Sequence, residues 1–316
     1  MEAPEVSIVF TSFNHKQYLR QALDSLLTQT FRNFELIIVD DCSTDGSQEV
    51  LKEYAQKDER IRLTLNEKNS GSYVHSTNQG ALMATAPYII FEQCDDWAEP
   101  NQIERLMNEM RENNVGVVYS CSNMVDEEGR TMGMDFDGRE KAFKQQHSKD
   151  SVICGSEAKE YLLESCIIPN LSAALIKKDL FEELKGLSDK FVVLADWDFW
   201  LRASLNCDFY YIREPLNNFR QHAATIRSSV KIRRQVGEVY TMMFNLSGIK
   251  QISMTQACHK SASLCIRWAT NGWCEWLKAL PHLLWDGTKQ STYFPIAFTI
   301  ESIKISTKKV LTLCKK

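Results

Sequence analysis

The chain has 316 residues, of which 44% are hydrophobic and 25% are charged, with 13 glycines and 7 prolines. This composition is typical of globular proteins and excludes disordered, collagen-like and low-complexity chains. The net charge of −4 is unevenly distributed, because residues 227–316 hold 14 Lys and Arg against four Asp and Glu. An acidic body with a basic C-terminal segment indicates two parts with different surroundings.

The spacing of the cysteines and the lengths of the apolar runs indicate in which cellular compartment the protein is expected. The ten cysteines are scattered, and no pair has the C-x-x-C spacing of zinc ribbons or thioredoxin-like redox sites. This usage favours a reducing environment. The first residues, MEAPEVSIVF, are acidic where an export signal is basic, and no apolar run reaches the ~18 residues of a membrane span. We therefore expect a cytoplasmic protein that is either soluble or peripheral on the inner face of the cell membrane.

Short β-rich segments alternate with segments of helical periodicity through the first half of the chain. The apolar, β-branched run at residues 6–10 predicts a buried parallel strand. Ser47 and Pro100 suit the first turns of two later helices. This order of elements predicts an α/β fold with a mostly parallel central sheet flanked by helices. Strands are predicted at residues 6–10, 34–39, 61–65, 88–91 and 115–119, and helices at 18–27, 47–56, 74–84 and from 100 onward.

The second half of the chain has a different pattern. Residues 126–150 are polar and interrupted by glycines, which predicts a long loop or ribbon. Helices near 157–164, 179–184 and 196–205 are expected before a strand at 209–212, and the chain after residue 229 has helical periodicity throughout. We expect one domain over residues 1–228 and a basic, helical C-terminal region over residues 229–316.

Polar clusters follow three of the predicted strands, namely TSFN at residues 11–14, DDCSTDGS at 40–47 and EQCDDW at 92–97. Ligands of open α/β sheets bind beyond the carboxyl ends of the strands, so these clusters are expected to converge. Adjacent carboxylates can hold Mg²⁺ or Mn²⁺, the usual partners of a diphosphate. Neither a G-x-G-x-x-G turn nor a P-loop motif is present. The pattern favours a nucleotide site that works through carboxylates and a metal.

The runs VSIVFTSFN and SLLTQTFRNFELIIVDDCSTDGS, then N-x-G at Asn69 and Gly71, then CDDW, resemble family 2 glycosyltransferases over roughly residues 5–225. The resemblance implies the glycosyltransferase A fold, with a nucleotide-binding half over about residues 1–122 and an acceptor half over about 123–228. It also implies an inverting, metal-dependent transfer from a nucleotide-diphosphate sugar, with UDP favoured. Because the Q-x-x-R-W motif of processive synthases is absent, we expect a single sugar to be added to a saccharide or lipid-linked oligosaccharide in cell-surface polysaccharide synthesis.

The resemblance implies which residues bind the nucleotide. Asp41 would accept a hydrogen bond from the pyrimidine N3–H, as a carboxylate does well. Phe13 stands where Tyr is commoner and would stack in its place. The residues expected to bind the nucleotide are Thr11, Phe13, Asn14, Asp41 and Asp95, the last of them at the ribose or sugar.

The same resemblance assigns the metal and the catalytic base. Asp96 and His222 are expected to hold Mn²⁺ or Mg²⁺, and Arg220 is expected to approach the phosphates. Asp196, in the run LADWDFWLRA, is expected to take the proton from the acceptor hydroxyl. His15 is expected to be an ordinary surface residue.

Alternatives remain open at this stage. Asp41, Asp96 and Asp196 also suit the caps of turns and helices. Cys94 and Ala195 depart from the family pattern, so a nucleotide-sugar-binding or scaffold protein with a degenerate site is a second hypothesis. The basic C-terminal region suits either a solvated helix face or an anionic membrane surface, where each Lys contributes ~1 kcal/mol. A nucleic-acid partner is not expected, because no binding motif accompanies the basic residues.

Overall fold

A computed structural model describes residues 3–134, 141–223, 230–269 and 273–313. The chain divides into two compact units. The sheet unit comprises Met1–Leu162 and Cys166–His222, and the helical unit comprises Leu163–Ser165 and Ala223–Lys316. The domain boundary that we expected after residue 228 falls within residues 224–229, outside the described residues.

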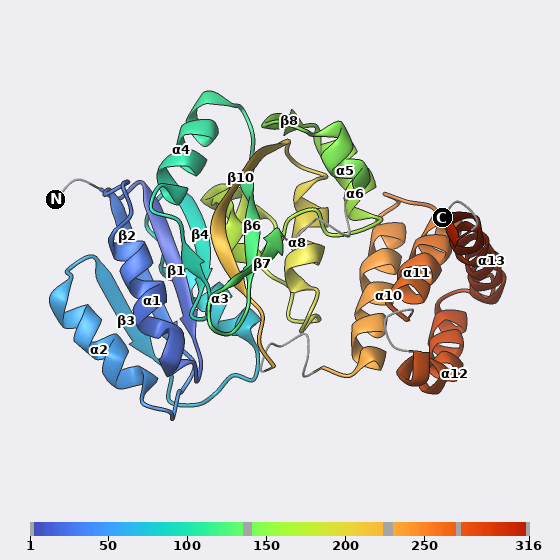
Figure 1. The fold of residues 1–316 in the computed structure, drawn as a ribbon, viewed down its shortest axis with the longest axis horizontal. Coiled ribbons are helices and arrows are strands. Elements are labelled where there is room, and N and C mark those ends of the chain that lie inside the picture. Colours follow the sequence, from blue (N-terminus) through green and yellow to red (C-terminus); the bar gives the residue numbers. More distant parts are fainter. Residues whose placement is uncertain (1–2, 135–140, 224–229, 270–272, 314–316) are drawn as a thin grey trace. The chain divides into compact units, whose positions relative to one another are not determined.

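The sheet unit is built on one sheet with helices on its faces (Figure 1). Its strands are β1 (Val6–Ser12), β2 (Phe34–Asp40), β3 (Ile61–Leu65), β4 (Tyr88–Gln93), β5 (Trp97–Ala98), β6 (Val117–Val125), β7 (Thr131–Met134), β8 (Ser151–Ile153), β9 (Ala174–Lys177) and β10 (Phe209–Arg220). Its helices are α1 (Lys16–Leu27), α2 (Ser47–Lys57), α3 (Tyr73–Met83), α4 (Gln102–Glu112), α5 (Lys141–Gln146), α6 (Gly155–Leu162), η1 (Leu171–Ala173), α7 (Lys178–Glu183) and α8 (Ala195–Ala203). Among the described residues the strand order is β3-β2-β1-β4-β9-β6-β10-β5, with β7 beside β6 and β8 beside β10.

The strands β3, β2, β1 and β4 run parallel, and helices cover both of their faces. Val6, Ile8 and Phe10 of β1 pack in one core with side chains of α1, α2 and α4. Val9 points to the other face, where α3 lies so close that a Cβ on Gly80 would come 2.4 Å from Val9 Cγ1. Because both faces are covered, every residue of β1 and β2 is buried. The expected helix-flanked α/β fold is confirmed.

The other half of the sheet differs in detail from the expectation. The unpredicted strand β9 inserts antiparallel between β4 and β6, and β10 runs for 12 residues where only 209–212 was expected. The pairing of β10 with β6 shifts register around Pro215, and this irregularity obscures the alternation in the sequence. Residues 126–150, expected as a loop or ribbon, contain β7 as the ribbon partner of β6 and the short helix α5.

The helical unit contains α10 (Ile232–Gly248), α11 (Met254–Ala269), α12 (Trp273–Gln290) and α13 (Phe294–Leu313). Its own small core includes Val236, Tyr240, Cys265 and Phe294. The helical periodicity predicted after residue 229 is therefore present. Within the described residues, every helix falls short of the length and apolarity that crossing a bilayer demands.

Candidate functional site

The carboxyl ends of β1, β2 and β4 meet at one edge of the sheet. The parallel pairing places Ser12 of β1 opposite Asp40 of β2, and Thr11 opposite Gln93 of β4. The three polar clusters that follow these strands therefore lie together, as the sequence predicted.

The carboxylates that follow β2 hold the loops at this edge. Asp40 is fully buried and accepts hydrogen bonds from the backbone N–H and the hydroxyl of Ser43 and from Gln48 Nε2. Asp41 is also buried, and it accepts from Asn66 Nδ2 at 3.2 Å and from the N–H and hydroxyl of Ser70 at 3.0 and 2.8 Å. The loop after β3 is thus fastened to Asp41 at the edge where a nucleotide base is expected.

Thr11, Phe13 and Asn14 have three different surroundings. Thr11 is buried and donates its hydroxyl to Gln93 Oε1 at 3.0 Å, which links β1 to β4. Asn14 has a left-handed backbone with φ of 51°, and its side-chain oxygen accepts from Thr44 N at 2.8 Å. Phe13 is 40% exposed. Of these three residues, Phe13 offers an accessible aromatic face for stacking, while the polar atoms of the other two contact neighbouring loops and strands.

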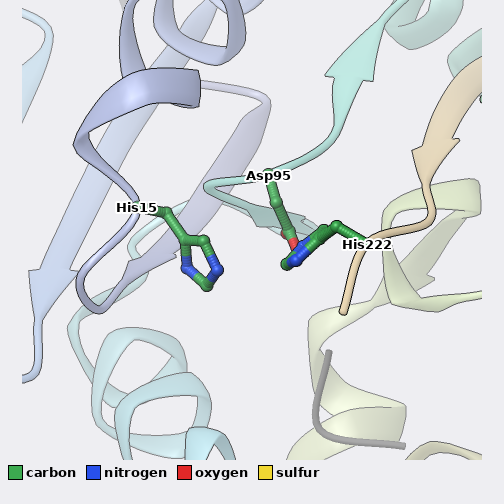
Figure 2. A group of neighbouring side chains, drawn as sticks. All are labelled: His15, Asp95 and His222. Carbon is green, nitrogen blue, oxygen red and sulfur yellow. The ribbon is translucent and has the colours of Figure 1, made fainter. Parts of the chain in front are cut away.

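Three side chains from distant parts of the sequence form a cluster of metal-ligand type (Figure 2). His15 precedes α1, Asp95 follows β4 and His222 follows β10, and their ligand atoms all lie within 4.8 Å of one another. His222 Nε2 lies 3.0 Å from Asp95 Oδ2, and the His15 and His222 rings meet edge to face at 5.1 Å. Imidazole and carboxylate side chains are common ligands of divalent transition metals.

Of the two expected metal ligands, the structure brings His222 into this cluster and leaves Asp96 outside it. Asp96 is buried, and its carboxylate accepts from the backbone N–H of Arg220 at 3.0 Å and from Ser172 Oγ at 3.2 Å. Burial raises the pKa of Asp96 well above its ordinary value, and the neighbouring charge of Asp95 adds to this. Asp95 and Asp96 thus point to different partners, and Asp96 joins three segments of the sheet unit.

Arg220 fastens the end of β10 to the loop after β4. Its guanidinium is sandwiched between the rings of Tyr18 and Trp97, at 4.3 and 4.8 Å from their centroids. It donates from Nε to the Asp95 carbonyl, from Nη1 to the Glu127 carbonyl and from Nη2 to Gln21 Oε1. The expectation that Arg220 approaches phosphates is therefore corrected, because its side chain is buried and binds other parts of the chain.

The first turn of α8 carries the expected catalytic carboxylate. Asp196 is half-buried, and its Oδ1 accepts from the Trp197 backbone N–H at 2.8 Å. Asp198, two residues on, is buried and pairs with Arg202 at 2.8 Å. The nearby Trp197 indole donates to the Leu162 carbonyl, which anchors this turn in the core. A carboxylate in the first turn of a helix is favoured by the helix dipole.

The comparisons with known proteins identify the family. The model described as Glycosyl transferase family 2 matches residues 7–184. The chain belongs to this family and is a glycosyltransferase. An uncharacterized glycosyltransferase of Methanocaldococcus jannaschii is 31% identical over 224 residues, which is 70% of this chain and 72% of that protein. TuaG of Bacillus subtilis, named as a glycosyltransferase of teichuronic acid biosynthesis, is 32% identical over 40% of this chain and 50% of its own.

Solved structures share the fold. A crystal structure of S. aureus TarS in complex with UDP-GlcNAc superposes with a TM-score of 0.70 at 15% identity, covering 96% of this chain and 92% of that one. A second TarS structure, in complex with UDP, superposes with a TM-score of 0.69 at 17% identity, over 94% and 88% of the two chains.

His15 is the residue that sequence reasoning missed. It was assigned to the surface, yet its ring lies beside His222 and Tyr18 at the edge of the sheet. One signal was available, because His15 directly follows the polar cluster after the first strand. Its partners are 80 and 207 positions away along the chain, so only the fold reveals their proximity.

We predict that Arg220→Lys lowers the free energy of unfolding of the sheet unit by about 2–4 kcal/mol. A lysine cannot reach all of these separated acceptors, so the contacts that this buried side chain makes with the neighbouring segments are lost. Urea denaturation followed by tryptophan fluorescence measures the effect. Arg213→Lys, on an exposed position of the same strand, serves as the matched control and should cost less than about 1 kcal/mol. Equal losses in the two variants would contradict the role of Arg220.

A second prediction concerns Glu92, which lies buried on β4. Burial, and then the nearby Asp96 carboxylate, raise the pKa of Glu92 well above its ordinary value. Its Oε1 has no hydrogen-bond partner within the described part of the chain. A carboxyl with a raised folded-state pKa is protonated on folding, so its stabilising effect is complete at low pH and is lost as pH rises through the folded pKa.

Glu92→Gln removes this titration while keeping the side-chain shape. We expect the variant to match the wild type near pH 4 and to exceed its unfolding free energy at pH 8 by on the order of 1 kcal/mol or more. Urea unfolding at a series of pH values measures the difference. A difference that stays constant with pH would show that Glu92 does not titrate as described.

Proposed function

We propose that this glycosyltransferase transfers one sugar from a UDP-sugar to a hydroxyl of a saccharide or lipid-linked oligosaccharide in cell-surface polysaccharide synthesis. The observation that carries the proposal is the meeting of Phe13, Asp41 and the His15–Asp95–His222 cluster at one sheet edge. The UDP and UDP-GlcNAc in the TarS structures support a UDP-sugar as the donor. The name of TuaG supports a role in the synthesis of a cell-surface polysaccharide.

The donor would lie along this edge. The exposed ring of Phe13 stacks on the uracil, and the Asp41 carboxylate accepts its N3–H alongside the donors it already has. Thr11 and Asn14 act by holding the strand and loop at this edge, because their side chains bond to Gln93 and Thr44. The ribose and diphosphate would then extend toward Asp95.

A divalent cation fits the cluster of His15, Asp95 and His222 at this edge of the sheet. Asp95 and His222 present a carboxylate oxygen and an imidazole nitrogen 3.0 Å apart, a donor set that suits Mn²⁺. We therefore place the metal on Asp95 and His222, and assign Asp96 to positioning through Arg220 and Ser172. When bound, the cation would offset charge on the leaving diphosphate.

Asp196 is proposed as the catalytic base. An acceptor hydroxyl must lose its proton as its oxygen attacks the anomeric carbon, and a positioned carboxylate can take that proton. Asp198 is unsuited to this task, because its carboxylate is buried against Arg202. A single displacement assisted by one base inverts the anomeric configuration.

We predict that Asp196→Asn lowers sugar transfer by about 10²–10⁴-fold and leaves UDP binding unchanged. Turnover is measured as UDP release from a panel of UDP-hexoses and UDP-N-acetylhexosamines with Mn²⁺, with water taking the place of the acceptor hydroxyl, and binding is measured by calorimetry with UDP. Asp189→Asn removes an exposed carboxylate of the same unit and serves as the control. Wild-type transfer by Asp196→Asn would refute the assignment. UDP binding by the wild-type chain without any turnover would favour the alternative of a binding or scaffold protein.

We also propose that the helical unit contacts anionic membrane. On α13, Ile296 and Ile303 are exposed seven residues apart, which places them on one face, and Lys304 is exposed beside them. On α12, Trp285 is exposed and Lys289 lies over its ring at 5.3 Å. Exposed apolar and aromatic side chains next to lysines are typical of interfacial helices, and the basic excess of residues 227–316 suits an anionic surface.

Vesicle binding tests this surface. We expect the chain to sediment with vesicles that contain phosphatidylglycerol, and the double variant Ile296→Ser/Ile303→Ser to bind roughly tenfold more weakly, because two apolar side chains no longer enter the interface. Leu82→Ser, which removes an exposed leucine from the sheet unit, is the control. Equal binding by the double variant, or failure of the wild type to bind, would contradict the membrane contact.

A further inference from the structure

The local fold does not explain why residue 15 is a histidine. It is the N-cap of α1, where Ser, Thr, Asp or Asn is usual, and its side chain makes no capping hydrogen bond. The backbone on either side is fastened to the loop after β2: Asn14 N donates to Ser43 Oγ, and Lys16 N donates to Asp45 Oδ2, both at 2.9 Å. The left-handed backbone of Asn14 turns the chain at this point. The backbone of His15 is thus held in place without its imidazole, which is not used to cap the helix.

The imidazole of His15 has a partner on the opposite loop. Its Nδ1 lies 3.6 Å from the Sγ of Cys94, which is buried and directly precedes Asp95. Metal-bound histidines commonly use their second ring nitrogen for a hydrogen bond that fixes the ring orientation. Contact through Nδ1 leaves Nε2 for the cluster with Asp95 and His222. Cys94, the departure from the family pattern noted in the sequence, is therefore paired with His15.

We propose that His15 is a third protein ligand of the metal, oriented by Cys94, and that this site binds Mn²⁺, Co²⁺ or Zn²⁺ in preference to Mg²⁺, without requiring a nucleotide. The proposal extends the metal site of the proposed function, which rests on Asp95 and His222. It concerns the identity of the ion and the order in which ion and nucleotide can bind.

The donor set accounts for the preference. Mg²⁺ favours oxygen ligands and keeps several of its waters, whereas imidazole suits the transition metals. Two imidazoles and one carboxylate leave coordination positions open for diphosphate oxygens and water. The ligand atoms already lie within 4.8 Å of one another, so small rotations of the side chains bring them to the bond lengths of about 2.0–2.2 Å that such ions require. Three protein ligands hold an ion more firmly than two, which allows it to bind before the donor.

Simple aromatic packing is the competing explanation for His15. Its ring lies 6.0 Å from that of Tyr18 and 5.1 Å from that of His222, distances typical of ring contacts. A His15→Phe variant separates the two explanations, because phenylalanine keeps an aromatic ring and removes both nitrogens. His15→Gln is a second variant that keeps polarity. His75→Phe, at an exposed histidine on α3, is the matched control.

The test is direct metal binding by the full chain in the absence of nucleotide. Mn²⁺ is titrated and the free ion is followed by its paramagnetic resonance signal, with Mg²⁺ as competitor and the visible spectrum of bound Co²⁺ as a report on its ligands. We expect one Mn²⁺ per chain, with Mg²⁺ competing only at concentrations at least about tenfold higher. His15→Phe and His15→Gln should weaken Mn²⁺ binding by about tenfold or more and change the Co²⁺ spectrum. Cys94→Ala should weaken binding by a smaller factor, and His75→Phe should have no effect.

Three results would overturn the proposal: unchanged Mn²⁺ affinity in both His15 variants, equal competition by Mg²⁺, or no Mn²⁺ binding by the wild type until UDP is added. UDP binding and sugar transfer are measured separately on the same preparations. A wild type that binds Mn²⁺ through His15 but neither binds UDP nor transfers sugar would refute the proposed function alone. A wild type that binds UDP with Mn²⁺ and is indifferent to His15 would refute the third ligand alone.

Discussion

The buried guanidinium of Arg220 is the interaction on which the geometry of the candidate site depends. Its side chain donates to the backbone carbonyl of Asp95, while its own backbone N–H donates to the carboxylate of Asp96. The end of β10 and the loop after β4 are therefore joined through two hydrogen bonds, both donated by Arg220. Because His222 follows Arg220 by only two residues, this connection also sets the distance between His222 and Asp95. An arginine suits the position because its planar fork can serve separated acceptors while its faces contact Tyr18 and Trp97.

The sequence was sufficient to predict the sheet edge but not the side-chain partners at that edge. Buried parallel strands have long apolar runs, and their carboxyl ends must lie together, so the meeting of the clusters after β1, β2 and β4 follows from pattern alone. Asp95 and Asp96 are adjacent, and nothing in their order indicates which carboxylate turns inward. That choice depends on Ser172 and on the end of β10, which are distant in sequence. The sequence also did not show that His15 lies in the cluster with Asp95 and His222, because these residues are distant from one another along the chain.

The parts of the fold that escaped prediction are short or irregular. Strand β9 has four residues, too few to establish an alternating pattern, and its neighbours β4 and β6 define it through pairing. Strand β10 carries Pro215 at a shift of register, where a proline in a sequence argues against a strand. Both elements matter for the site, since η1, just before β9, brings Ser172 to Asp96, and β10 ends at Arg220.

The charge at this edge favours the cation that we propose. A donor diphosphate would approach Asp95, whose carboxylate is partly exposed, so two negative groups would meet at short range. Arg220 cannot relieve this repulsion, because its guanidinium hydrogen bonds go to Asp95 O, Glu127 O and Gln21. A divalent cation held by Asp95 and His222 would offset this repulsion and would let the donor diphosphate bind beside the same carboxylate. Imidazole ligands bring no negative charge to an ion, so a cation in this cluster would keep more of its positive charge for the diphosphate than one held by carboxylates alone.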